Sequence, residues 1–158
     1  MFSDSMKTAI YKGDVRKLRD ITDEWLLECR CNDFGISVDT EKQLDDLQKM
    51  VDGNGSALIV LLDGDNNAVG YLGIVVIDSP IGKQMIANEH YWYVCRHARG
   101  IGSLRLLVAA EEWAMERGCS HLIMNASVMA SSLCDSVCKL YERLGMAKFE
   151  TSYIKLVQ

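Results

Sequence analysis

The chain contains no run of eighteen apolar residues, and its start, MFSDSMKTAIYKGD, has no basic region followed by an apolar one. A helix needs about twenty apolar residues to cross a bilayer, and an export signal needs a basic region before an apolar core. Neither membrane insertion nor export is therefore indicated. We expect a cytoplasmic protein with no membrane partner.

Metal-binding patterns are also missing. The three histidines are scattered along the chain, and no Cys-x-x-Cys pair occurs among the six cysteines. The pairs Cys29 with Cys31 and Cys134 with Cys138 are close in sequence, but a tetrahedral zinc site needs four converging ligands. We therefore expect no metal. Without an export signal, reduced, buried apolar thiols are favoured over a disulfide framework.

An excess of basic residues is absent as well. The chain has 17 Lys and Arg against 22 Asp and Glu, a net charge of −5 and a pI near 5.2. Binding to a phosphate backbone relies on a broad basic face. A nucleic-acid site around Arg96, Arg99 and Arg105 remains an alternative, but the overall charge argues against it, and we expect no nucleic-acid partner.

The composition that is present is that of a globular protein. The chain has 158 residues, of which 49% are hydrophobic and 25% charged. This length is enough to bury a substantial core. We expect residues 1–158 to form a single domain.

Apolar periodicity and turn residues predict the order of the elements. A strand at 7–11 precedes a helix capped by Asp14 that reaches about Cys31, and a second helix starts at Asp39 or Thr40 and passes Val51. The expected elements that follow are strands at 56–62, 68–77 and 85–94, a long helix to about 118, a strand at 121–127, a helix at 135–144, and one or two strands within 147–157.

This order predicts an α+β fold with a mixed, mostly antiparallel sheet. Residues 63–67, Asp-Gly-Asp-Asn-Asn, are typical of a hairpin turn between antiparallel strands. The long helix instead crosses from the strand at 85–94 to the strand at 121–127, and such crossovers join parallel strands. One parallel pair is therefore expected inside the sheet.

The most informative stretch is the junction between the strand that ends at Val94 and the long helix. Arg96, Arg99, Gly100 and Gly102 lie in the turn. The first N–H groups of a helix have no intrahelical partner, and glycine lets an anion approach the backbone, so this turn predicts a phosphate site. Neither G-x-x-x-x-G-K-[ST] nor the full G-x-G-x-x-G occurs, which argues against nucleoside triphosphates and dinucleotides. A bulky residue at Gly102 is predicted to block phosphate without unfolding the chain.

Two motifs in this order resemble the GNAT superfamily of acyl-CoA-dependent N-acetyltransferases. Arg99-Gly100-Ile101-Gly102-Ser103-Leu104 resembles the family's R/Q-x-x-G-x-G/A turn, with Leu104 where Gly or Ala is usual, and an alternative register starts at His97. Later, Leu140, Tyr141 and Gly145 match Leu-Tyr-x-x-x-Gly-Phe. Met146 replaces the aromatic residue, and Cys134 stands where Asn is common.

The resemblance implies that the parallel strands splay apart and hold acetyl-CoA, as co-substrate, in the gap. The pyrophosphate is expected on the N–H groups of residues 99–104, and the pantetheine along the end of the preceding strand. The implied cofactor-binding residues are Tyr93, Val94, Arg99, Gly100, Ile101, Gly102, Ser103 and Leu104.

The resemblance also implies catalytic roles. Glu89 matches the position of the family's strand-borne general base, acting directly or through water, and His90 is a second candidate. Tyr141 is the expected general acid, because a phenol with a pKa of about 10 can protonate a departing thiolate. Packing alone is the competing interpretation for Tyr141, and a solvent-facing position for Glu89.

The acceptor is expected to be a primary amine of a small molecule or a protein lysine. Residues 20–52 carry ten acidic and three basic side chains, and in the family this region faces the acyl-CoA, so a cationic amine is favoured. Solvated faces of two amphipathic helices explain the same charges. A catalytically inactive acyl-CoA-binding or protein-interaction module is the alternative function, and a homodimer remains open.

Overall fold

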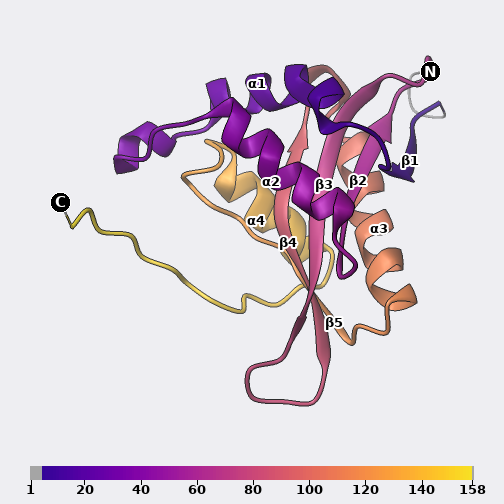
Figure 1. The fold of residues 1–158 in the computed structure, drawn as a ribbon. Helices are drawn as coiled ribbons and strands as arrows, with labels where there is room; N and C mark the ends of the chain where they lie inside the picture. The colour runs from indigo at the N-terminus through magenta and orange to yellow at the C-terminus, as the bar shows by residue number, and fades with distance from the viewer. Residues whose placement is uncertain (1–4, 158) are drawn as a thin grey trace.

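The computed structural model describes residues 5–157 and is built on a five-stranded sheet of order β1-β2-β3-β4-β5 (Figure 1). The first four strands pair antiparallel, and β4 pairs with β5 in parallel, which confirms the predicted fold class. The strands are β1 (Lys7–Ile10), β2 (Ser56–Leu62), β3 (Ala68–Asp78), β4 (Met85–Val94) and β5 (His121–Ile123).

The turn between β2 and β3 forms as its sequence predicts. The carboxylate of Asp63 accepts the backbone N–H groups of Asp65 and Asn67, both at 2.9 Å. Asn66 takes a φ of 64°, a left-handed conformation that Asn tolerates better than most residues. The turn therefore fixes the register of the hairpin that leads into β4.

Four α-helices and three short 3₁₀ helices complete the described chain. They are η1 (Val15–Leu18), α1 (Arg19–Glu28), η2 (Cys31–Phe34), α2 (Thr40–Asp52), η3 (Arg96–Ala98), α3 (Ile101–Glu116) and α4 (Cys134–Arg143). The predicted first helix is thus divided, because Asp14 caps a 3₁₀ turn before α1 begins. Among the described residues, no helix is both long and apolar enough to traverse a membrane.

The helices cover the sheet in two layers. On one face, α1 and α2 pack Ile21, Leu44 and Leu47 against the sheet, in a core that includes Tyr71 and Tyr93. On the other face, α3 contributes a core of its own, which includes Leu106 and Trp113. Figure 1 shows α1 and α2 on the near side of the strands. The carboxyl end of β4 therefore lies between these two layers.

The parallel pair is short. It runs from Ile86 opposite His121 to Asn88 opposite Ile123. The prediction that this last strand extends to residue 127 is wrong, because β5 stops at Ile123 while β4 continues to Val94. Past Asn88, no strand among the described residues pairs with this edge of β4.

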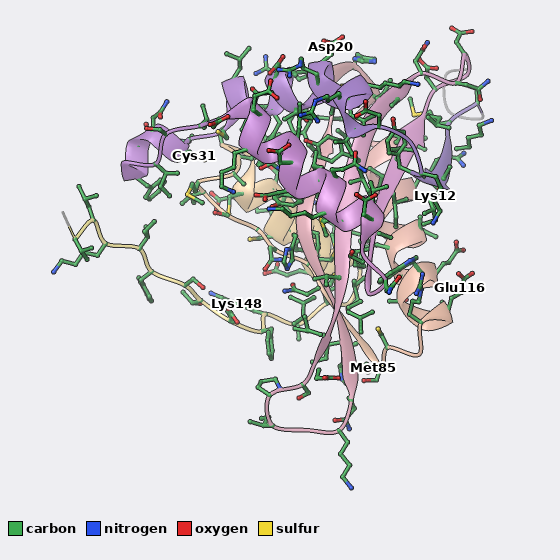
Figure 2. The ribbon with its side chains drawn as sticks, viewed as in Figure 1. Lys12, Asp20, Cys31, Met85, Glu116 and Lys148 are labelled. Atoms are coloured by element: carbon green, nitrogen blue, oxygen red, sulfur yellow. The ribbon has the colours of Figure 1, made fainter. Side chains whose placement is uncertain are left out.

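The prediction of one or two strands within 147–157 is also wrong in this structure. The segment contains no strand and extends away from the sheet, as the position of Lys148 shows (Figure 2). Phe149 and Tyr153 are 74% and 95% exposed. The residues have strand propensity, but a strand also needs a neighbour for its hydrogen bonds. A β5 of three residues offers little edge to pair with.

Candidate active site

A bulge in β4 determines which way its side chains point. Gly73 pairs with Tyr91 and Ile74 with Glu89, which leaves His90 as the extra residue. Simple alternation would place Ala87 and Tyr91 on one face. Instead Ala87 joins the core beneath α3, while Tyr91 packs against the core on the α1 and α2 side. The bulge lies next to Glu89, where β4 and β5 separate.

Glu89 is a buried acid next to this bulge. It is 5% exposed, and burial raises its pKa from 4.5 to about 7. Hydrogen bonds from Asn125 partly oppose that shift: the backbone N–H donates to Oε2 at 3.0 Å and the side-chain Nδ2 donates at 3.3 Å. A carboxyl group whose pKa lies near neutral pH is suited to accept and release protons.

The raised pKa of Glu89 predicts a pH-dependent cost to stability. Between pH 4.5 and about 7 the unfolded chain loses this proton while the folded chain keeps it, so the contribution of Glu89 to stability falls as pH rises. A shift of this size corresponds to about 3 kcal/mol. Relative to the wild type, Glu89→Gln should therefore gain stability from pH 4.5 to 8, as urea unfolding at several pH values would measure. A constant difference between the two proteins across this range would contradict the burial effect.

Tyr141 reaches the same region from α4. Its hydroxyl donates to the backbone carbonyl of Asn125 at 2.9 Å, and its ring stacks on Trp92 with centroids 6.0 Å apart. The side chain is buried, and desolvation followed by the negative charge of Glu89 raises its pKa. The phenol therefore stays protonated at neutral pH. The structure thus brings the two predicted catalytic residues together through Asn125.

Asn125 is the site residue that sequence reasoning missed. It lies two residues after β5, in a stretch predicted to continue the strand. The polar side chain of Asn125 directly after the apolar run Leu122-Ile123-Met124 was the only available signal, and polar residues are common at strand ends. His90, the second candidate base, is exposed at the bulge and lies edge-on to the ring of Tyr91, 6.2 Å between centroids.

The turn after β4 leaves a helix start open. Helix α3 begins after Gly100 with no capping side chain from the described residues. Gly100 has a φ of 90°, and an added Cβ there would meet no atom within 4 Å. Free N–H groups and open space at a helix start form a site that an anionic group such as a phosphate can occupy.

Gly102 differs from its predicted role. It is buried, and an added Cβ would lie 2.7 Å from Leu61 Cδ2 and 3.2 Å from Met6 Sδ. A bulky residue would therefore force α3 away from β2, at a cost of about 1–3 kcal/mol or more. These contacts argue against the expectation that such a change would leave the stability of the fold unaffected. In the same first turn of α3, Ser103 is half-buried, while Ile101 and Leu104 are exposed.

The side chain of Arg99, one of the implied cofactor-binding residues, already has partners within the chain. Its Nη2 lies 2.6 Å from Glu28 Oε2, and its Nε donates to the Val94 carbonyl at 3.0 Å. Arg96 is 3.8 Å from the same carboxylate, with its own side chain largely exposed. The guanidinium of Arg99 therefore pairs with Glu28 of α1. The backbone of Arg99 still lies in the turn before α3.

Val94 rather than Tyr93 presents its peptide groups to the free edge of β4. The N–H of Cys95 donates to Val69 of β3 at 2.9 Å, so by alternation the N–H of Val94 points away from β3. The hydroxyl of Tyr93 donates to Glu28 at 2.6 Å on the α1 side. Of the two residues predicted to line the pantetheine, only Val94 directs a backbone N–H to this edge, since its carbonyl already accepts from Arg99 Nε.

The match to a known protein family decides the identity of the fold. The profile described as "Acetyltransferase (GNAT) family" matches residues 19–146, which is most of the chain. The chain belongs to the GNAT acetyltransferase family. No curated protein is similar enough to the chain to match it.

Solved structures of this family share the fold. The aminoglycoside N-acetyltransferase AAC(6')-Iy in complex with CoA has a TM-score of 0.75 and 14% identity, over 96% of this chain and 93% of its own. A ribosomal-protein-alanine N-acetyltransferase from Brucella melitensis has a TM-score of 0.70 and 19% identity, over 96% and 99%. A GNAT family acetyltransferase from Staphylococcus aureus has a TM-score of 0.66 and 16% identity, over 97% and 99%.

The cysteines of this GNAT chain are free thiols, and they are less buried than predicted. Only Cys95 is buried, and Cys138 is exposed. Within residues 5–157, no group of three or more His, Cys, Asp or Glu side chains is arranged to hold a metal ion. Cys134, at the position where the family often has Asn, is half-buried at the start of α4.

Proposed function

We propose that residues 1–158 form one acyltransferase domain that moves an acetyl group from acetyl-CoA to a primary amine of a small molecule or a protein. The observation that carries the proposal is the chain of hydrogen bonds from buried Glu89 through Asn125 to Tyr141. It lies where β4 loses its parallel partner. Membership of the GNAT family and the CoA complex of a related fold support the same activity.

The acyl-CoA would lie along the free edge of β4. The N–H groups at the start of α3, residues 101–103, would receive the pyrophosphate next to open Gly100. The N–H of Val94 would donate to a carbonyl of the ligand, and in the family this donor polarises the thioester carbonyl. A donor held in place before the reaction stabilises the negative charge that develops on the carbonyl oxygen.

Glu89 and Tyr141 would handle the protons. Glu89 accepts the proton that the amine nitrogen loses, directly or through water, as the nitrogen bonds to the acyl carbon and the carbon–sulfur bond breaks. Tyr141 gives its proton to the departing thiolate after exchanging its hydrogen bond to Asn125 for one to sulfur. When Glu89 becomes neutral, it no longer raises the pKa of Tyr141. The phenol therefore becomes a better acid at the moment its proton is needed.

An inactive binding module is the rival function. The departures at Leu104, Cys134 and Met146 motivated it, and the buried acid with a pKa near 7 favours an enzyme instead. Burying a carboxyl group costs stability, and a pure binding module gains nothing from it.

A calorimetric titration with acetyl-CoA and CoA, followed by thiol release with a panel of amines, tests the proposal. We expect saturable binding of both ligands and amine-dependent release of CoA thiol. Binding without thiol release for any amine would support the inactive module. Absence of binding would refute both the acetyltransferase and an acyl-CoA-binding module, and would leave a protein-interaction module as the alternative.

The same assay tests the acceptor, which we propose is a cationic amine such as an aminoglycoside-like molecule, a polyamine or a protein lysine. The related AAC(6')-Iy is an aminoglycoside N-acetyltransferase. Many carboxylates of residues 20–52 already have partners: Glu41 and Asp45 face Arg16, Asp46 pairs with Lys42 and Lys49, Asp33 pairs with Arg30, and Asp39 caps α2. The negative electrostatic potential of residues 20–52 is therefore weaker than their number of acidic side chains suggests.

We accordingly expect a modest preference that salt removes. At low salt, cationic amines should have a lower KM than neutral ones, and the difference should shrink as ionic strength rises. Asp33→Asn and Asp39→Asn are useful comparisons because both carboxylates lie in this segment. A preference for anionic or neutral amines, insensitive to salt and to both substitutions, would exclude this segment from acceptor choice. A cytoplasmic location and a homodimer remain predictions, which cell fractionation and light scattering would test.

A further inference from the structure

We propose that Asn125 is a positioning residue that holds the Glu89 carboxylate and the Tyr141 hydroxyl in one hydrogen-bonded chain where β4 and β5 separate. The inference rests on the proposed function, because it assigns Asn125 a part in the same proton transfers. It is carried by the geometry of three strand and helix segments that meet at this one residue.

The side chain of Asn125 continues the hydrogen bonding between β4 and the segment after β5, beyond the last backbone pair. The last parallel pair is Asn88 with Ile123, two residues before Asn125. From there the side-chain Nδ2 of Asn125 donates to the Glu89 carbonyl at 2.6 Å, and approaches Asn88 Oδ1 at 3.4 Å. A side-chain amide thus replaces a ladder bond, and β4 is held to the following segment without a strand between them.

The polarity of these contacts matches the two proposed roles. Asn125 offers only donors to the Glu89 carboxylate, its backbone N–H at 3.0 Å and its Nδ2 at 3.3 Å. It offers an acceptor, its backbone carbonyl, to the Tyr141 hydroxyl. Donors favour the ionised form of a carboxylate, and an acceptor orients the proton of a phenol. One residue therefore supports a base on one side and an acid on the other.

Few groups near Glu89 contribute to the shift of its pKa besides burial. Tyr141 is the titratable residue that faces Glu89 from α4, and its raised pKa keeps it protonated. The two contributions that lower the pKa of Glu89 both come from Asn125, its backbone and its side-chain hydrogen bonds. Asn125 itself is exposed, whereas Glu89 and Tyr141 are buried, so Asn125 forms the solvent-facing side of the hydrogen-bonded chain.

The test compares Asn125→Ala and Asn125→Asp with the wild type. Ala removes the Nδ2 donor and keeps the backbone N–H, while Asp keeps the size of the side chain and brings a second carboxylate toward Glu89. The pKa of Glu89, followed by NMR of labelled glutamate carboxyl carbons, should rise by about one unit in Ala and by more in Asp. The acid limb of the kcat/KM pH profile should move to higher pH in both variants, and further in Asp than in Ala. We expect kcat to fall roughly tenfold to a hundredfold, with little change in acetyl-CoA affinity.

Asn88→Ala is the matched control, because Asn88 contacts the same amide but neither the Glu89 carboxylate nor Tyr141. Asn88→Ala should leave unchanged the pKa of Glu89 and the acid limb of the pH profile of kcat/KM. Lower stability of the Asn125 variants with an unchanged Glu89 titration would show that Asn125 only ties the strands together, and would overturn the proposal. A shifted Glu89 titration in the Asn125 variants, together with a wild-type protein that transfers no acyl group, would refute the proposed function but support the link through Asn125.

Discussion

Turnover should fall by roughly 10²- to 10⁴-fold in Glu89→Gln and in Tyr141→Phe, while acetyl-CoA still binds. Each change removes one proton-transfer group and keeps the shape of its side chain. Neither residue lies at the start of α3, where the pyrophosphate is proposed to bind. Steady-state kinetics with a saturating amine and a calorimetric titration with acetyl-CoA would measure the two quantities separately.

The pH dependence of the Glu89 effect gives a sharper signature. Below pH 7 the wild-type carboxyl group is increasingly protonated and cannot accept a proton, so kcat/KM should fall with an apparent pKa of about 7. This limb should be missing in Glu89→Gln. The amine has its own titration, but that titration is common to both proteins and cancels in the comparison.

Matched substitutions far from the site provide the controls. Glu116→Gln at the end of α3 and Tyr153→Phe in the exposed C-terminal segment make the same chemical changes elsewhere. Both should retain wild-type turnover. Full activity in Glu89→Gln and in Tyr141→Phe would remove the two residues from the mechanism. Because the two groups serve one reaction, the double variant should lose less than the product of the two single effects.

Most of the sheet could be predicted from local patterns, because its pairings depend on short-range signals. The hairpin turn at Asp63 and the crossover helix α3 each specify a neighbouring pair of strands. The C-terminal segment could not be predicted in the same way. Its alternation is typical of a strand, but whether a strand forms depends on an available edge, which is a property of the whole sheet.

The two residues proposed for proton transfer could be named from the sequence because they stand at positions that resemble the family's motifs. Glu89 stands five residues before Val94, and Tyr141 lies in a recognisable helical motif. Asn125 was not predictable, because its importance comes from lying opposite Glu89, 36 residues away in sequence. The bulge at His90 was hidden for a related reason, since it appears only in the register between β3 and β4.

Gly102 illustrates how one residue type can serve two purposes. A glycine at a helix start is consistent with phosphate approach, yet here the missing Cβ makes room for Leu61. Sequence cannot separate these purposes because both require the same absence of a side chain. A test of the pyrophosphate site therefore needs a position that faces outward from the first turn of α3.

Ser103→Asp is expected to abolish tight binding of acetyl-CoA without harming the fold. Ser103 is the third residue of α3 and is half-buried. A carboxylate in the first turn of a helix stabilises it by about 0.3–1 kcal/mol through the helix dipole, so the melting temperature should hold or rise. The same carboxylate would repel a pyrophosphate at that helix start. Like charges brought together cost several kcal/mol, so affinity should fall about 100-fold or more.

Ser103→Asn separates charge from size, because Asn and Asp have nearly the same shape. It should bind acetyl-CoA within a few-fold of the wild type, since Asn adds no negative charge. S-acetylpantetheine, which lacks the pyrophosphate, should discriminate little between the two variants. Affinity for acetyl-CoA close to that of the wild type in both the Asp and the Asn variant would place the pyrophosphate away from α3. Loss of affinity in both variants would instead indicate a steric block, and only the charge-specific loss supports the helix start as the anion site.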